Sequence, residues 1–523
     1  MSPQTRGVLK AAGLITALTL LSRFAGLLRK LAQSWAMSDG AVATAYDTAN
    51  TVPNVLFEVA AGGALAGAVI PLISGFIARG ERKHADQTAS ALLSWVLVIG
   101  VPVALIVVAA AHPIAAALFG GNGDSAIVNL AAVLLQVFAI QVPLYGLSVV
   151  LSGILQAHGK FGLPALAPLL SSIVVIAAFS LYALRVGPEV APDALNSTWI
   201  AVLAWGTTAG VMVFSLPQLI PAMRLMRLRP TLRFPEGIGR KTLRLAGAGL
   251  ATLLAQQIAI IVIMVVANSA GGVGAYNAFN YAYTVFMVPY AVLAVPIATA
   301  TFPKIAAAVG TADKQATADL AANSTRMVLA MGITAAGLLV VCAEPAKIVL
   351  EVGREIEGLD LVLAAMAIGV IGFSLLYHGA RVLYALEAGR AAIAVNSIGW
   401  GLVSAILIAA TLGGVRGRVP VLLAIGAAMS VGLLAGGIAV ILMLRRRLGP
   451  AGVAGIWRTL AAGGLPVVVT AAPAWFAVSA VTNAFHASIL GAFVAAAIGA
   501  LIVIGAAFAG LYAADRSTLA ALR

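Results

Sequence analysis

Charged residues are scarce in this sequence. Asp, Glu, Lys and Arg make up only 10% of the 523 residues, whereas 62% are hydrophobic and the mean hydropathy is +1.04. Soluble domains are about a quarter charged and about half apolar. Because so little charge cannot cover a water-exposed surface, the composition excludes a soluble domain and indicates an integral membrane protein.

Residues that commonly carry chemistry are also scarce. Cys342 is the single cysteine, so an internal disulfide and a cysteine-based metal site are excluded. The five histidines form no H-E-x-x-H pattern, and neither a P-loop nor a catalytic serine arrangement occurs. The sequence therefore predicts a protein that is not an enzyme, with no metal, no ATP site and no cofactor, and it leaves the coupling ion unknown.

The positive net charge has an explanation within a membrane protein. The chain carries 32 Lys and Arg against 18 Asp and Glu, a formal charge of +14. Lys and Arg accumulate in cytoplasmic loops of membrane proteins. We therefore expect membrane lipids, and no nucleic acid, as the surroundings of this chain.

Apolar runs separated by charged or Gly/Pro-rich turns predict about fourteen transmembrane helices, since one span needs roughly 20 apolar residues. Most basic residues then fall on one side of the membrane, including the basic stretch 224–244, while the loop 344–360 on the other side is acidic on balance. This asymmetry predicts that both termini are cytoplasmic. The predicted helices span residues 10–37, 45–78, 86–111, 126–157, 162–184, 197–223, 243–268, 274–308, 317–343, 360–387, 390–412, 420–444, 455–481 and 485–514.

A weak internal repeat predicts the domain organisation. Residues 153–173 and 381–398 both contain a helix end, a small polar turn with one cation, and a new small-residue helix ending in Ser-Ile. They lie six predicted helices apart, as in transporters built from parallel repeats. We expect four parts: a first six-helix lobe at 1–223, a basic cytoplasmic linker at 224–242, a second six-helix lobe at 243–447 and an appended helix pair at 448–523.

The first predicted helix carries cations within the membrane. Ser22 and Arg29 are seven residues apart and share one helical face, and Arg23 and Lys30 share its neighbour. Arg23 lies ~20 Å from the start of the helix at 1.5 Å per residue, which is too deep for an interfacial anchor. Lys30 lies nearer the end, where a long side chain can reach the interface, and we do not include it in the site.

The second predicted helix carries acid and amide groups. Asp47, Asn54 and Glu58 follow at spacings of seven and four and so share one stripe. Arg29 and Glu58 lie at similar depth, so they either form a structural ion pair or act in binding. Arg23 has no evident acidic partner in this hairpin. An unpaired arginine in a membrane is by default a functional candidate, and its planar fork suits phosphate.

These residues carry a resemblance to a known family. The patterns Ser22-Arg23-x-x-Gly26-x-x-Arg29, Tyr46-Asp47-x5-Pro53-Asn54 and residues 63–71 resemble the opening of the MurJ/MviN lipid II flippase family. That family belongs to the multidrug/oligosaccharidyl-lipid/polysaccharide exporter superfamily. The resemblance implies two six-helix bundles around a central cationic cavity plus two C-terminal helices.

The resemblance also implies a function and partners. It predicts export of lipid II from the inner to the outer leaflet of the bacterial cytoplasmic membrane by alternating access, and contact with cell-wall synthesis proteins. The implied site for the substrate diphosphate comprises six residues: Ser22, Arg23, Arg29, Asp47, Asn54 and Glu58. The chain departs from the family pattern in its charges. Phe57-Glu58 replaces an Arg-Arg pair, and no cation occurs in residues 281–289, so we expect a less positive cavity.

Two alternatives remain at this stage. A drug or cation antiporter, or another polysaccharide-lipid flippase of the same superfamily, would explain the helix count but not the Ser-Arg and Asp-Pro-Asn patterns. A membrane-embedded glycosyltransferase would need a positioned acid or base near the membrane surface. The acidic residues in 344–360 offer candidates for that role, although a solvated acidic loop is the better explanation of them.

Overall fold

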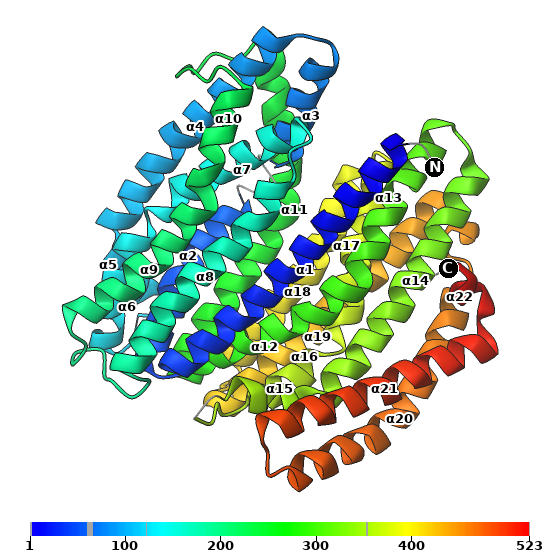
Figure 1. Ribbon diagram of the computed structural model, residues 1–523. Helices are drawn as coiled ribbons and strands as arrows, with labels where there is room; N and C mark the ends of the chain where they lie inside the picture. The colour runs from blue at the N-terminus through cyan, green and yellow to red at the C-terminus, as the bar shows by residue number, and fades with distance from the viewer. Residues whose placement is uncertain (1–2, 60–65, 122, 352–353, 522–523) are drawn as a thin grey trace. The chain divides into compact units, whose positions relative to one another are not determined.

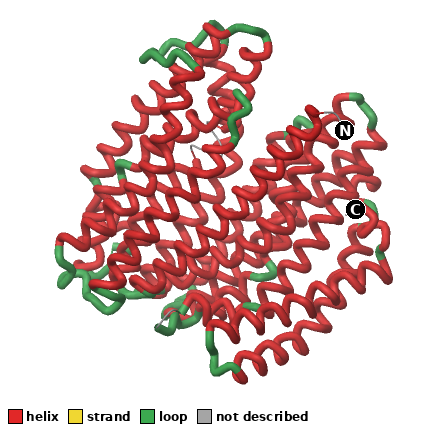
Figure 2. Tube along the Cα trace, in the orientation of Figure 1, coloured by secondary structure: helices red, strands yellow, loops and turns green. Residues whose placement is uncertain are grey.

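A computed structural model describes residues 3–59, 66–121, 123–351 and 354–521. Within these ranges the chain is helical and contains no strand (Figures 1 and 2). It divides into two compact units, Met1–Gln257 and Ile258–Arg523, and the division falls inside α11. Residues 63–65 of the family-like pattern lie outside the described residues.

The first unit is built from the helices up to α11. Within it α1 packs on α8, α8 on α9, α2 on α6, and α4 on α7. The bounds are α1 Pro3–Met37, α2 Ala41–Glu58, α3 Ala66–Ala78, α4 Arg82–Ala109, α5 Ala111–Leu118, α6 Ser125–Phe138, α7 Gln141–Ala157, α8 Gly162–Arg185, α9 Ser197–Ser215, η2 Leu216–Gln218, α10 Leu219–Leu225 and α11 Ile238–Val266.

The second unit ends in a hairpin of two long helices, α20 and α21, which lie side by side (Figure 1). Here α14 packs on α17 and α20, and α19 packs on α17 and α18. The bounds are η3 Ala267–Gly271, α12 Ala275–Pro289, η4 Tyr290–Ala294, α13 Val295–Gly310, α14 Lys314–Val341, α15 Ala343–Leu350, α16 Leu359–Met366, α17 Gly369–Ala385, α18 Gly389–Leu412, α19 Arg418–Leu448, η5 Pro450–Val453, α20 Ile456–Ala484, α21 Ile489–Ala514 and α22 Arg516–Ala521.

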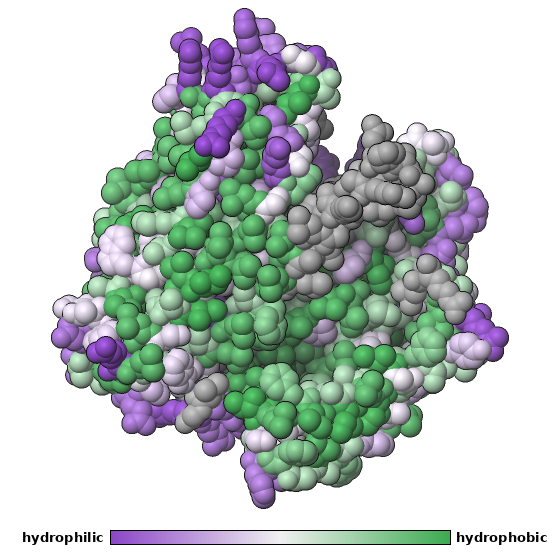
Figure 3. Space-filling model, in the orientation of Figure 1, coloured by the Kyte–Doolittle hydropathy of each residue, from purple (hydrophilic) through white to green (hydrophobic). Residues whose placement is uncertain are grey.

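The helices have the lengths and composition of membrane spans. Eleven helical segments of the described chain are long and apolar enough to cross a membrane, or twelve when the bent pair α16–α17 is one span. The predicted spans 10–37 and 45–78 are not in that number, so the total of fourteen stays a prediction. In the first unit the sides of the visible helices are hydrophobic and hydrophilic side chains gather at the helix ends (Figure 3), as expected for a multi-pass membrane protein.

Several predicted helices are divided in the structure, and two of them show how. Residues 126–157 form α6 and α7, and residues 360–387 form α16 and α17, which meet at an angle of 51°. Ser430 of α19 satisfies the backbone at the second break, because its hydroxyl donates to the Ala365 carbonyl (2.7 Å) and accepts from the Gly369 N–H (3.2 Å). A break inside a membrane span needs such a partner, since no lipid group can supply it.

Four helices of the first unit have the same lengths as four helices of the second, while the predicted repeat stays a prediction. In the first unit α4, α5, α7 and α8 have 28, 8, 17 and 24 residues. In the second unit α14, α15, α17 and α18 also have 28, 8, 17 and 24 residues. The two similar sequence segments fall on the α7–α8 and α17–α18 junctions. The eight-residue helices α5 and α15 were not predicted, because they are too short to read as spans.

Aromatic packing in the core of the first unit fixes the helix that carries the acid and amide stripe. Tyr46 of α2 is buried, and its ring meets those of Phe138 and Phe179 edge-on at centroid distances of 5.5 Å each. Its hydroxyl lies 2.7 Å from that of Thr207 on α9. Edge-on aromatic pairs contribute about 0.5–1.5 kcal/mol each beyond the area that they bury. This contact therefore holds α2 in register against α6, α8 and α9.

Candidate functional site

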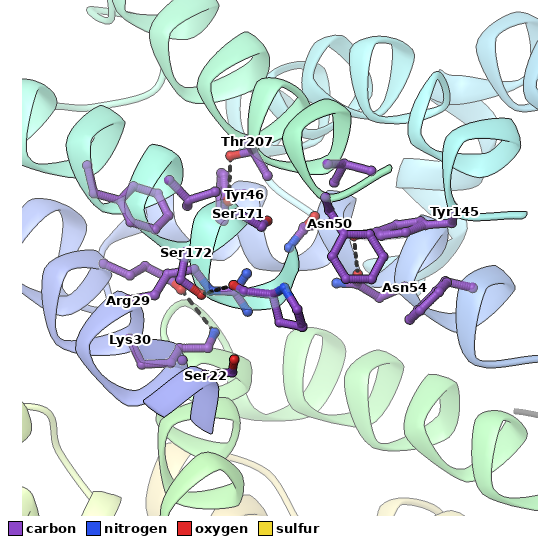
Figure 4. A pocket seen from close by; sticks show the side chains of 18 of the residues that line it. Ser22, Arg29, Lys30, Tyr46, Asn50, Asn54, Tyr145, Ser171, Ser172 and Thr207 are labelled. Carbon is purple, nitrogen blue, oxygen red and sulfur yellow. Dashed lines mark hydrogen bonds between the residues drawn. The ribbon is translucent and has the colours of Figure 1, made fainter. Parts of the chain in front are cut away.

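A polar cavity of about 500 Å³ lies within the first unit, between α1, α2, α7, α8 and α9 (Figure 4). Nineteen residues line it, and the charged ones come from α1 and α2 alone. They are Ser22, Gly26, Arg29, Lys30, Gln33, Tyr46, Asn50, Asn54, Phe57, Glu58, Tyr145, Pro168, Ser171, Ser172, Val175, Phe179, Thr207, Val211 and Phe214.

Helix α1 contributes one polar face to the cavity. Ser22, Gly26, Arg29 and Gln33 recur at spacings of three and four, which places them on one side of the helix. The Ser22 hydroxyl lies 3.0 Å from the Ala165 carbonyl of α8 and 2.8 Å from the Leu18 carbonyl of its own helix. Ser22 thereby joins α1 to α8 at the edge of the cavity.

Lys30 is held by a buried acid. Its ammonium lies 3.6 Å from the Asp47 carboxylate and donates to the Gln33 side-chain oxygen at 2.9 Å. The Gln33 amide in turn donates to Asp47 at 2.8 Å. Asp47 is only 2% exposed and does not itself line the cavity. The Asp47 carboxylate thus already compensates the Lys30 ammonium on the cavity wall.

Arg29 differs from Lys30, its neighbour in sequence. Its side chain lines the cavity, and among the described residues it has neither a salt bridge nor a hydrogen bond. Glu58 also lines the cavity, yet the ion pair between Arg29 and Glu58, one of our two readings of the sequence, is not formed in the described structure. Arg29 therefore presents to the cavity a guanidinium that no described acid pairs with.

Helix α2 supplies acceptors from its own polar face. Asn50, Asn54 and Glu58 line the cavity at successive spacings of four residues. Asn54 accepts a hydrogen bond from the Tyr145 hydroxyl of α7 at 3.2 Å, and the two lie on the side of the view away from Arg29 (Figure 4). The side-chain oxygen of Asn50 is buried without a hydrogen-bond partner in the described part of the chain.

The structure gathers four of the six predicted site residues around one cavity: Ser22, Arg29, Asn54 and Glu58. Asp47 does not line the cavity but forms an ion pair with Lys30, which does. Arg23 is exposed and does not line the cavity. The cavity therefore gives no support to Arg23 as its principal cation.

Lys30, Asn50 and Tyr145 are among the lining residues that sequence reasoning missed. Lys30 was set aside as a side chain that reaches the interface, whereas Asp47 draws it into the wall. Asn50 precedes Asn54 by one helical turn, so the stripe of Asp47, Asn54 and Glu58 already contained the signal for it. Tyr145 lies on α7, and no local pattern in the sequence connects that helix with α2.

Solved structures share the fold. A structure described as lipid II flippase MurJ in an inward-closed conformation matches with a TM-score of 0.74 at 18% identity, covering 96% of this chain and 99% of that one. An inward-facing multidrug resistance MATE family transporter of the MOP superfamily matches with a TM-score of 0.68 at 17% identity, covering 84% and 98%. The chain thus has the fold of a class of multi-helix membrane transporters.

Sequence comparison then identifies the family. The family model described as "Lipid II flippase MurJ" matches residues 34–514, and the chain belongs to this family. A probable lipid II flippase MurJ of Synechocystis is 31% identical over 242 residues, or 45% of this chain and 44% of the relative. The lipid II flippase MurJ of Burkholderia cenocepacia is 28% identical over 282 residues, 51% of each. The alignments span about half the length of these curated relatives, and Ser22, Arg23 and Arg29 precede the family-model match.

Proposed function

We propose that this protein moves lipid II from the inner to the outer leaflet of the bacterial cytoplasmic membrane by alternating access, with the substrate diphosphate bound beside Arg29. In this proposal it is a transporter rather than an enzyme, both termini are cytoplasmic, and cell-wall synthesis proteins act on its product. The proposal rests on membership of the MurJ family and on one observation, the unpaired Arg29 guanidinium on the wall of a polar cavity.

The chemistry of the cavity suits a diphosphate. A guanidinium donates two parallel hydrogen bonds to phosphate oxygens, a geometry that an ammonium cannot reproduce. Ser22 of α1 and Asn54 of α2 add neutral polar groups to the cavity lining. Lys30 contributes less net attraction because Asp47 already pairs with it. The apolar tail of the substrate remains in lipid, where it loses no hydrophobic contact.

Release requires that the anion is not held too tightly. The cavity wall carries two cations, Arg29 and Lys30, and one acid, Glu58, with Asp47 behind Lys30. In our proposal Asp47 holds Lys30 away from the anion, and Glu58 supplies the opposing charge that lets the diphosphate leave. The near balance of charge agrees with the departures from the family pattern noted in the sequence.

Three variants test the role of Arg29 in cells depleted of their own lipid II flippase. Arg29→Ala should abolish growth while the protein still reaches the membrane, and Arg29→Lys should restore it only in part. Loss of a charged hydrogen-bonded contact costs about 2–3 kcal/mol, so lipid II binding to purified Arg29→Ala protein should weaken about 30- to 150-fold.

Arg23→Ala serves as the matched comparison, because Arg23 lies on the same helix but outside the cavity. It should impair growth less than Arg29→Ala. A greater loss for Arg23 than for Arg29 would move the diphosphate site away from this cavity. Binding of lipid II should exceed that of a cationic drug, and the reverse preference would replace the proposed function with drug antiport.

A further inference from the structure

The polar face of α2 ends in an acid for which the described part of the chain supplies no counterion. Asn50, Asn54 and Glu58 lie four residues apart in turn, and all three line the cavity. Glu58 forms no salt bridge and no hydrogen bond with any described residue. An ionised carboxylate without a partner is costly inside a membrane protein and is by default a functional candidate. The protonation state of Glu58 should therefore depend on which charged molecule binds in the cavity.

The charged and titratable groups around Glu58 are few. Helix α1 presents Arg29 and Lys30 to the same cavity, α7 presents Tyr145, and α2 itself carries Tyr46 and Asp47. Among the described residues α8 and α9 present only neutral, non-titrating side chains, and α6 has no titratable residue. On α5, His112 bonds Asn129 at an exposed position. With Lys30 paired to Asp47, Arg29 is the other cation that the described residues present to the cavity that Glu58 lines.

Resting on the proposed function, we infer that Glu58 takes up a proton when a diphosphate binds beside Arg29, and returns that proton when the anion leaves. A bound anion engages the Arg29 charge and places its own negative charge in the same cavity. Both effects favour the neutral carboxylic acid over the carboxylate, because like charges repel and a paired arginine no longer compensates. The proton comes from water and adds to one carboxylate oxygen.

The cavity has room and polar groups for the water that such an exchange needs. At about 500 Å³ it holds several water molecules. Asn54 is engaged by Tyr145, whereas the buried Asn50 oxygen lacks a partner among the described residues and can accept a hydrogen bond from water. Water bound along this stripe reaches Glu58 from within the cavity.

Linkage makes the exchange measurable. If anion binding promotes protonation of Glu58, protonation must strengthen anion binding by the same factor. Above the pH at which Glu58 ionises in the free protein, the Kd should then rise by up to about tenfold for each pH unit. Lipid II is a suitable probe because its disubstituted diphosphate lacks the monoester proton that titrates near pH ~6.

The experiment is calorimetric titration of the full-length protein in lipid nanodiscs with lipid II, in two buffers of different ionisation enthalpy. The difference in heat gives the number of protons taken up, which should approach one per anion for the wild type and zero for Glu58→Gln. The variant should also lose the pH dependence of Kd, staying constant within about twofold. Glu81→Gln is the matched control, because Glu81 is an acid of the same unit that pairs with Arg79 outside the cavity.

The possible outcomes separate this inference from the proposed function. Lipid II binding without proton uptake, or with equal uptake in Glu58→Gln, overturns the inference and leaves the flippase proposal standing. A soluble nucleotide diphosphate sugar, also a disubstituted diphosphate, is titrated in parallel. If it binds with Glu58-dependent proton uptake while lipid II does not bind, the inference holds and the flippase proposal fails.

Discussion

The ion pair behind the cavity wall makes a quantitative prediction. With 3.6 Å between the Lys30 ammonium and the Asp47 carboxylate, Coulomb attraction at an effective dielectric constant of about 20 is about 5 kcal/mol. Desolvation of both groups offsets most of this attraction in the intact protein. Removal of one partner is different, because the other charge keeps its desolvation cost and loses the attraction of its counterion.

Asp47→Ala should therefore lower the free energy of unfolding by about 3–5 kcal/mol. Lys30→Met should cost less, since Asp47 keeps its hydrogen bond from Gln33 at 2.8 Å. The double variant Lys30→Met/Asp47→Leu should return to within about 1 kcal/mol of the wild type, because no charge is then left alone.

Denaturant unfolding of the three variants in detergent micelles, arranged as a double-mutant cycle, measures the coupling between the two residues. The single losses should exceed the double loss by several kcal/mol. If each single variant costs less than about 1 kcal/mol and the two losses simply add, then Asp47 does not hold Lys30 and the account of the cavity charge is wrong.

Two further predictions concern the second unit. Gly372→Ala should strongly reduce thermal stability, because the added Cβ would overlap the backbone of Leu433 on α19. Gly401→Ala on α18 should be neutral or slightly stabilising, because no atom lies within 4 Å of the added Cβ. Equal effects of the two substitutions in a thermal unfolding assay would refute the close contact at Gly372. Burial alone would raise the pKa of Asp515, but hydrogen bonds from Thr459, Thr518 and Ser517 hold that pKa below its ordinary value. The ionised Asp515 therefore contributes its full stabilisation above its ordinary pKa of about 4, and this stabilisation is lost as the pH falls through the lower pKa of the folded protein. Protease cleavage near the C-terminus should increase at acidic pH in the wild type and should not change with pH in Asp515→Asn.

Most helix positions follow from the sequence, because in lipid every span must satisfy its own backbone and so must be a long apolar helix. The division of 126–157 and 360–387 into two helices each does not follow from it. At the second break the deciding group is Ser430, 61 residues beyond Gly369, and that partner emerges only when α19 packs beside α17.

The sequence by itself determined the class of this protein, its family and the presence of charge in the first two helices, since composition and residue spacing are local properties. It also placed Ser22 and Arg29 on one face and Asn54 and Glu58 on another. Only the tertiary structure decided how those charges are used. In the structure Lys30 pairs with Asp47, and Arg29 and Glu58 line one cavity without forming an ion pair. Arg23 is not among the residues that line this cavity. Pairing depends on distances between helices, and helical periodicity fixes only the face on which a residue lies.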